Sequence, residues 1–220
     1  MKKVIYNKYD KALIGGLPQV LFPGEVVVIV DAAEADRAVE FLLSHPLLGV
    51  DTETRPSFRK GKQNRVALLQ VATPQRCFLF RLNRLGLVAS VVRLLEDKGT
   101  LKVGLSLHDD LLSLHRLGAF TAGRFADLQD LMTEIGIEDK SLQKLYANLF
   151  HEKISKRQQL SNWENDTLSE KQKRYAATDA WACINLYNEY NRLRETGDYQ
   201  LVISEAKKEE YVQESISEEG

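Results

Sequence analysis

The sequence predicts an α/β protein in which a mixed β-sheet is flanked by α-helices. Five short segments rich in β-branched and aromatic residues occupy the first half of the chain. Segments with apolar residues at three-to-four spacing, typical of amphipathic helices, lie between and after them. From about residue 127 helical patterns dominate, so we expect strands mainly in the first half and helices throughout.

The order of these segments predicts how the sheet is connected. Only residues 73–75 separate the third and fourth predicted strands, which favours an antiparallel hairpin, whereas the helical stretch before residue 101 permits a parallel return. The predicted strands are residues 26–30, 47–54, 65–73, 76–82 and 101–106. The predicted helices in this half are residues 32–44, 85–97 and 109–118.

The size and composition indicate one globular domain with short appendages. A chain of 220 residues with 44% hydrophobic and 28% charged residues fits a single hydrophobic core. Residues 1–24 contain two adjacent glycines and two prolines and are expected to form an irregular arm. We predict the main domain at residues 25–200 and an acidic tail at residues 201–220, which contains six Glu and two Lys.

Several functional classes are disfavoured by the same data. No apolar run approaches the roughly 20 residues of a membrane helix, and the first ten residues lack a signal-peptide apolar region. Cys77 and Cys183 lie in apolar contexts that favour buried thiols, so we predict a cytoplasmic protein without membrane contact and without an evident obligate protein partner. A net charge of −1 disfavours a broad basic surface but permits an enzyme that grips a few terminal nucleotides.

Three groups of acidic residues carry the functional prediction. Asp51 and Glu53 close an apolar strand at i and i+2, on the same face. Tyr175 and Asp179 are four residues apart in a helical pattern and share a helix face. The Asp109–Asp110 pair begins a predicted helix, where a capping role is the simplest interpretation. Together, these hard oxygen ligands suit Mg²⁺ or Mn²⁺, two of which can clamp a phosphodiester.

These residues resemble the motifs of the DEDDy-type 3′-5′ exonucleases, which include ribonuclease D and the exonuclease domain of the Werner helicase. The Asp51-Thr-Glu53 tripeptide is similar to the first motif, and Val103-Gly104 six residues before Asp110 is similar to the second. The third motif is similar to residues 175–180, YAATDA, preceded by Ser161-Asn-Trp163. The resemblance covers about residues 25–193.

The resemblance implies a ribonuclease H-like fold and a metal-dependent exonuclease that acts on a nucleic acid with a free 3′ end. It implies two divalent ions, Mg²⁺ or Mn²⁺, with Asp51 bridging them, Glu53 and Asp179 completing the first ion's shell, and Asp110 holding the second. Tyr175 is then expected to orient or deprotonate the attacking water. The implied catalytic residues are therefore Asp51, Glu53, Asp110, Tyr175 and Asp179.

The sequence leaves several alternatives open. The second-motif ligand is Asp110 by its distance from Val103-Gly104, with Asp109 as the alternative. Residues 156–159, KRQQ, depart from the Lys-Ser-x-Arg stretch of the family, which puts the phosphate contact of the family's arginine in doubt. A basic loop after the first motif either binds the strand or is a solvated charge run. The residues predicted to bind nucleic acid there are Arg55, Phe58, Arg59, Lys60 and Lys62.

The motifs do not distinguish DNA from RNA, because they contact metal and phosphate rather than the 2′-hydroxyl. Two other functions are compatible with the same motifs. One is a nucleic-acid-binding scaffold that keeps the fold without turnover. The other is a two-metal phosphoesterase that acts on small nucleotides.

Overall fold

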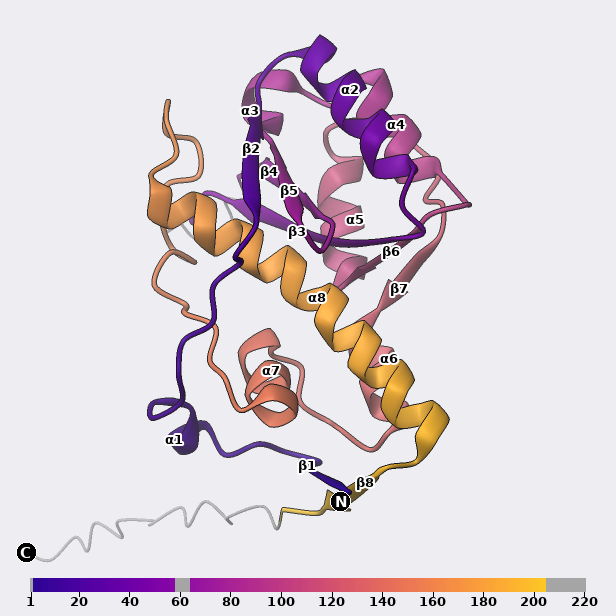
Figure 1. Ribbon diagram of the computed structural model, residues 1–220. Helices are drawn as coiled ribbons and strands as arrows, with labels where there is room; N and C mark the ends of the chain where they lie inside the picture. Colours follow the sequence, from indigo (N-terminus) through magenta and orange to yellow (C-terminus); the bar gives the residue numbers. More distant parts are fainter. Residues whose placement is uncertain (1, 58–63, 205–220) are drawn as a thin grey trace, which may run out of the picture.

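The computed structural model describes residues 2–57 and 64–204. A six-stranded mixed sheet forms its centre, with strand order β2-β5-β4-β3-β6-β7 (Figure 1). The strands of this sheet are β2 (Glu25–Ile29), β3 (Leu47–Thr54), β4 (Val66–Ala72), β5 (Arg76–Phe80), β6 (Leu101–Gly104) and β7 (Phe125–Asp127). The helices are α1 (Lys11–Ile14), α2 (Ala32–Leu43), α3 (Leu82–Leu85), α4 (Ala89–Glu96), α5 (Leu107–His115), α6 (Leu128–Glu134), α7 (Leu142–Phe150) and α8 (Glu170–Thr196).

The strand pairing follows the predicted connections. β4 and β5 form the antiparallel hairpin expected from the short 73–75 connection, and β3 also pairs with β4 in antiparallel orientation. β6 returns parallel to β3 after the helical stretch, as expected. β7, with three residues, was not predicted, because so short a segment shows no alternation that could be recognised. The prediction of a mixed sheet flanked by helices is confirmed.

Helices cover both faces of the sheet (Figure 1). On one face, α2, α4 and α5 pack on side chains such as Val50, Leu69 and Val71. On the other face, α8 crosses β3, β4 and β5 and contributes a row of small residues that includes Ala176, Ala177 and Ala180. The side chain of Trp163 is fully buried and packs with the small residues of α8.

The segment before the sheet differs from the expected irregular arm. Residues Lys3–Tyr6 form strand β1, which pairs in parallel with β8 (Tyr199–Val202) from the other end of the chain. Ile5 and Phe22 are buried, so hydrophobic contacts that the local sequence does not reveal hold this segment in place. β8 also places residues 201–202 in a strand rather than in the predicted tail, whose residues 205–220 lie outside the described part.

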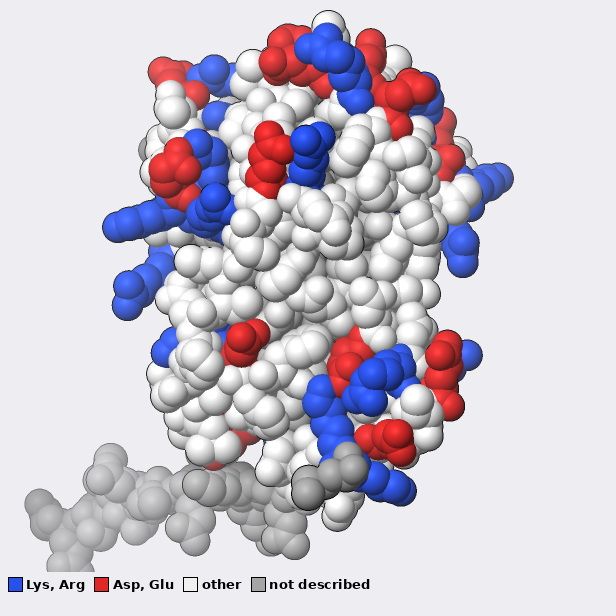
Figure 2. Space-filling model, viewed as in Figure 1, with Lys and Arg blue, Asp and Glu red and all other residues white. Residues whose placement is uncertain are grey.

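The surface carries charges of both signs. On the face shown in Figure 2, the Lys, Arg, Asp and Glu side chains of the described residues alternate around an uncharged centre rather than forming one broad basic area. This distribution fits the formal net charge of −1. Within the described residues, every helix is too short or too polar to cross a membrane.

Candidate active site

Strand β3 and helix α8 bring the first and third motifs together. Asp51 and Glu53 pair across the ladder with Gln70 and Leu68 of β4, a partner that packs under α8. A Cβ atom added at Gly49 would lie 1.9 Å from the Ala180 carbonyl oxygen. Only glycine therefore permits α8 to pack this closely, and this contact brings the residue beside Ala180, Asp179, up to the end of β3.

Three carboxylates converge where β3 passes under α8. One oxygen from each of Asp51, Glu53 and Asp179 lies within 4.8 Å of the others, a separation suited to a shared cation. Glu53 is 8% exposed and Asp179 is 6% exposed. Asp179 Oδ1 has no hydrogen-bond partner among the described residues. Because a buried carboxylate oxygen is costly without a partner, this donor set fits a divalent metal ion.

The structure favours Asp110 over Asp109 as the fourth carboxylate. The hydroxyl of Thr52, between Asp51 and Glu53, donates to Asp110 Oδ1 at 2.5 Å, whereas Asp109 is exposed. The first turn of α5 is fixed by Asp127, which accepts the backbone N–H groups of residues 106 and 107 at 3.1 and 2.7 Å. Asp110 therefore faces the other carboxylates from a braced helix.

Burial raises the pKa values of all four carboxyl groups. Burial raises the pKa of Asp51 well above its usual range, and the charges of Asp110, Asp179 and Glu53 add to it. Burial is also the largest cause of the raised pKa values of the other three groups. The pKa of Glu53 rises to about 9, that of Asp179 to about 7 and that of Asp110 to about 6. Without a cation these groups favour shared protons over full ionisation, and divalent ions would restore the ionised form.

Tyr175 lines the same cavity as the carboxylates. Burial raises the pKa of its phenol far above the ordinary value, and the charges of Asp179 and Glu53 add to the shift. A hydrogen bond between the phenol and Asp179 acts in the same direction. Its ring lies 6.0 Å from that of Trp163, which helps to fix its orientation. At neutral pH the phenol therefore keeps its proton and is a hydrogen-bond donor.

Asp51, Glu53 and Asp179, which together with the neighbouring Asp110 we call the carboxylate wall, line a cavity of about 330 Å³. A second group of residues, which we call the lysine wall, lines the same cavity. It consists of residues 140–143, before and in α7, and of Ile154, Ser155, Lys156 and Gln159, after α7. The charge of Lys156 lowers the pKa of Asp179 against the effect of burial. Neither Lys140 nor Lys156 forms an ion pair with another described residue. The cavity is thus lined by both acidic and basic groups.

The structure describes only the two ends of the basic loop, residues 55–57 and 64–65. Arg55 is about half exposed and forms an ion pair with Glu164 at 3.1 Å, so it does not point freely at a substrate. It lines a separate depression that also contains Asp109 and Ser113. Phe58, Arg59, Lys60 and Lys62 lie outside the described residues, and their proposed contact with nucleic acid stays a prediction.

The sequence analysis gave no role to three residues that help to build the site, Thr52, Asp127 and Lys140, and it noted Lys156 only as part of residues 156–159. Thr52 lies inside the first motif, where its alternation away from Asp51 gave no sign of a role. Asp127 is the last residue of β7, a strand too short to recognise. The two lysines sit in segments of mixed polarity, where a solvated surface is the simplest expectation.

Comparison with known proteins agrees with this arrangement. A family model described as 3′-5′ exonuclease matches residues 26–193. The chain is 31% identical over 190 residues to the mouse (Mus musculus) bifunctional 3′-5′ exonuclease/ATP-dependent helicase WRN, covering 82% of the chain and 14% of that protein. It is 32% identical over 186 residues to a 3′-5′ exonuclease of Arabidopsis thaliana, covering 77% of the chain and 65% of that protein.

A solved structure supports the fold independently. The EXO domain of Nibbler from Aedes aegypti superimposes with a TM-score of 0.69 at 20% identity, covering 77% of this chain and 89% of that one. The expected ribonuclease H-like architecture is thereby confirmed, and the resemblance to DEDDy-type enzymes agrees with the family match. The family model matches most of the chain, and the chain is more than 30% identical to relatives that are named 3′-5′ exonucleases. The chain therefore belongs to the 3′-5′ exonuclease family.

Proposed function

We propose that the chain removes nucleotides from the 3′ end of DNA or RNA by metal-dependent hydrolysis of the terminal phosphodiester. The observation that carries this proposal is the convergence of three carboxyl groups, Asp51, Glu53 and Asp179, in a cavity that also holds Tyr175, with Asp110 bonded to Thr52 beside them. All four carboxyl groups have raised pKa values. Family membership supports the same reaction class. A scaffold without turnover would have no need to keep such a costly group of acids together.

The carboxylate wall fits two divalent ions, Mg²⁺ or Mn²⁺. Asp51, Glu53 and Asp179 would hold one ion, since their oxygens lie close enough to share it. Asp110 would hold the second together with Asp51, whose pKa it raises more than any other neighbouring charge does. When bound, such ions activate a water and neutralise charge on the departing 3′ oxygen.

Tyr175 has the role of orienting the attacking water rather than deprotonating it. A general base needs a pKa near the working pH, whereas burial raises the pKa of this phenol further above that range. The phenol is instead held by Asp179 and by packing near Trp163, as a positioned donor should be. Orientation without proton transfer still lowers the barrier, because it fixes a near-attack geometry.

Lys156 is suited to the charge of the substrate. It lies on the lysine wall, and its charge already acts on Asp179. An ammonium group at this position would attract the non-bridging oxygens of the phosphate under attack. Lys156 thus offers a phosphate contact in the segment where the family's arginine is missing.

The proposal is tested with purified protein and 5′-labelled single-stranded, duplex and overhang substrates of both DNA and RNA, with Mg²⁺ or Mn²⁺. We expect ladders that shorten from the 3′ end, abolished by EDTA and by Asp51→Asn. Shortening from the 5′ end, or full activity in excess chelator, would contradict it. Binding of these strands without products would favour the scaffold, and cleavage confined to mononucleotide-sized substrates would favour the small-molecule phosphoesterase.

We also propose that residues 25–200 form the catalytic domain of a cytoplasmic protein. Cys77 and Cys183 support this location, because both are buried free thiols rather than a disulfide.

A further inference from the structure

We propose that Lys140 binds a phosphate of the substrate strand and that Asp139 positions it, through contacts with a segment that precedes the family domain. The inference rests on the proposed function, because it assumes a nucleic acid in the cavity. It adds a binding residue and a positioning residue to the carboxylates and Tyr175.

Lys140 is placed to meet a phosphate. It lines the same cavity as Asp51, Glu53 and Asp179, and it forms no ion pair with another described residue. Its carbonyl accepts the side-chain amide of Gln129 at 3.3 Å, so its backbone has a fixed partner while its side chain is exposed. When the terminal phosphate of a strand lies at the carboxylate wall, the next phosphates of that strand lie in or near the same cavity. A lysine ammonium is a suitable contact for them.

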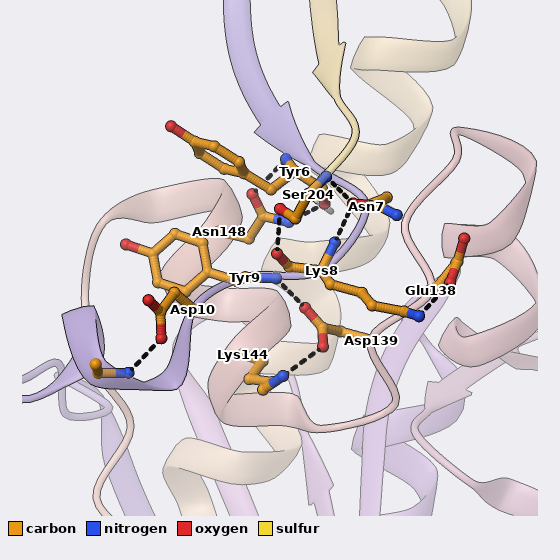
Figure 3. A network of polar contacts seen from close by, with 11 residues as sticks. Tyr6, Asn7, Lys8, Tyr9, Asp10, Glu138, Asp139, Lys144, Asn148 and Ser204 are labelled. Carbon is orange, nitrogen blue, oxygen red and sulfur yellow. Dashed lines mark hydrogen bonds and ion pairs between the residues drawn. The ribbon is translucent and has the colours of Figure 1, made fainter. Parts of the chain in front are cut away.

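Asp139 fixes the backbone directly before Lys140. Its carboxylate is 7% exposed and uses both oxygens: Oδ2 accepts the Tyr9 backbone N–H at 2.6 Å, and Oδ1 accepts Lys144 Nζ at 2.8 Å (Figure 3). One partner belongs to the N-terminal segment and the other to α7. Asp139 thus ties the start of the lysine wall to two elements at once.

The N-terminal segment is itself firmly attached. Asn148 of α7 is fully buried, accepts the Tyr6 N–H at 3.0 Å and donates to the Tyr6 carbonyl at 2.7 Å (Figure 3). Asn7 accepts the Ser204 N–H at 2.8 Å, which joins the segment to the chain after β8. Further along, the backbone of residues 18 and 20 bonds to that of Lys153.

These attachments lie outside the matched part of the chain. The family model begins at residue 26, so residues 3–22 lie outside the range that it matches. They contact the chain next to the lysine wall at two places, Asp139 and Lys153. The Phe22 N–H also donates to Thr178 of α8 at 3.0 Å, beside Asp179. The segment therefore supports the backbone on which Lys140 stands, as well as one end of α8.

A double-mutant cycle separates positioning from simple stabilisation of the fold. Steady-state cleavage of a 5′-labelled oligonucleotide is measured for wild type, Lys140→Ala, Asp139→Ala and the double variant at several salt concentrations. We expect Lys140→Ala to raise KM about fivefold to tenfold while kcat changes little, the size of one lost charge-assisted contact. The slope of log KM against log salt should fall by about 0.7, the value for one phosphate contact on a single strand.

Asp139→Ala should reproduce both changes, and the double variant should be no worse than Lys140→Ala alone, because the two act through one contact. Glu138→Gln is the matched control: it removes a neighbouring acid whose partner is the exposed Lys8 at 3.1 Å, and it should leave KM and the salt slope unchanged. If Asp139→Ala fails to fold by circular dichroism, Asp139→Asn replaces it and should show the same dependence on Lys140 with a smaller rise in KM.

Additive effects on KM, or an unchanged salt slope in Lys140→Ala, would overturn the inference while leaving the exonuclease proposal intact. Equal effects of Asp139→Ala and Glu138→Gln would also overturn it, since long-range charge alone would then suffice. Failure of the proposed function looks different: the wild-type protein itself would show no metal-dependent shortening.

Discussion

The carboxylate wall stands on regular elements of the family domain, whereas the lysine wall consists of the start of α7 and the loops on either side of that helix. Asp51 and Glu53 project from β3, Asp179 from α8 and Asp110 from α5, each fixed by a ladder or a helix. Side-chain hydrogen bonds from Asp139 and Asn148 join the lysine wall and α7 to the N-terminal segment. Sites on strands and helices are held more precisely than sites on loops, so we expect chemistry from the first wall and adjustable binding from the second.

The largest effect should come from the carboxylate wall. Asp51→Asn keeps the shape of the side chain but removes a charge shared by both proposed ions, a loss of several kcal/mol, or roughly 10³-fold in kcat. The fold should survive, because neutralising one of four repelling acids relieves strain. Single-turnover cleavage and metal titration measure the two properties.

The neighbouring pair supplies the control for that experiment. Asp110→Asn should be strongly impaired, while Asp109→Asn, an exposed residue outside the cluster, should cleave at close to the wild-type rate. The reverse order would show that α5 presents the other carboxylate to the metal.

A smaller loss is expected for Tyr175→Phe, which keeps the ring packed near Trp163 but removes the hydroxyl. Single-turnover cleavage should fall by about 10²-fold, the lower end for a positioned proton donor or acceptor, while metal binding persists. Because the pKa of the phenol is raised, the pH profile of the wild type should show no ionisation of Tyr175 near neutrality. A wild-type rate in this variant would remove the tyrosine from the mechanism.

The carboxylate wall should also make the metal-free protein sensitive to pH. The pKa values of Asp110, Asp179 and Glu53 are raised to about 6, 7 and 9, so the folded state holds protons that the unfolded state releases near pH 4. This contribution is present at low pH and is lost as the pH rises through those values. We expect Tm in EDTA to fall by at least ~5 °C between pH 5 and pH 8.5, and added Mn²⁺ to restore it.

Differential scanning calorimetry in EDTA and in Mn²⁺ provides the measurement. Asp51→Asn should flatten the fall, because one charge fewer repels its neighbours. A metal-free Tm that rises over this range would show that the four acids are not held close together in solution.

The smallest effect on activity should come from the support of the lysine wall. Asn148→Ala removes two hydrogen bonds and leaves the backbone groups of Tyr6 unpaired, which should destabilise the fold by about 2–3 kcal/mol. Amide hydrogen exchange in residues 3–6 should become faster. KM should rise by no more than about threefold, and kcat should not change. Asn83→Ala, an exposed position on α3, is the control that should change neither. A large fall in kcat would show that the two walls are coupled.

The two walls also differ in how well the sequence predicted them. Asp51, Glu53, Tyr175 and Asp179 could be proposed because their spacing within one strand or one helix already places them on common faces. Asp139 and Lys140 could not, since the partners that give them a role, Tyr9 and the opposite carboxylates, are far away along the chain. The regular structure within residues 3–22 was not predicted for the same reason, because the strand partner of β1 is β8, from the other end of the chain.

The sequence by itself determined the strands and helices of the sheet, the 73–75 hairpin and the acidic motifs, because periodicity, turn length and residue chemistry are local properties. Only the tertiary structure shows that Gly49 lets α8 approach β3, that the Thr52 hydroxyl donates to Asp110, and that burial raises the pKa of Tyr175. Close approach, hydrogen-bond partners and pKa values all depend on which groups exclude water around a side chain. Those groups come from separate elements, and folding alone brings them together.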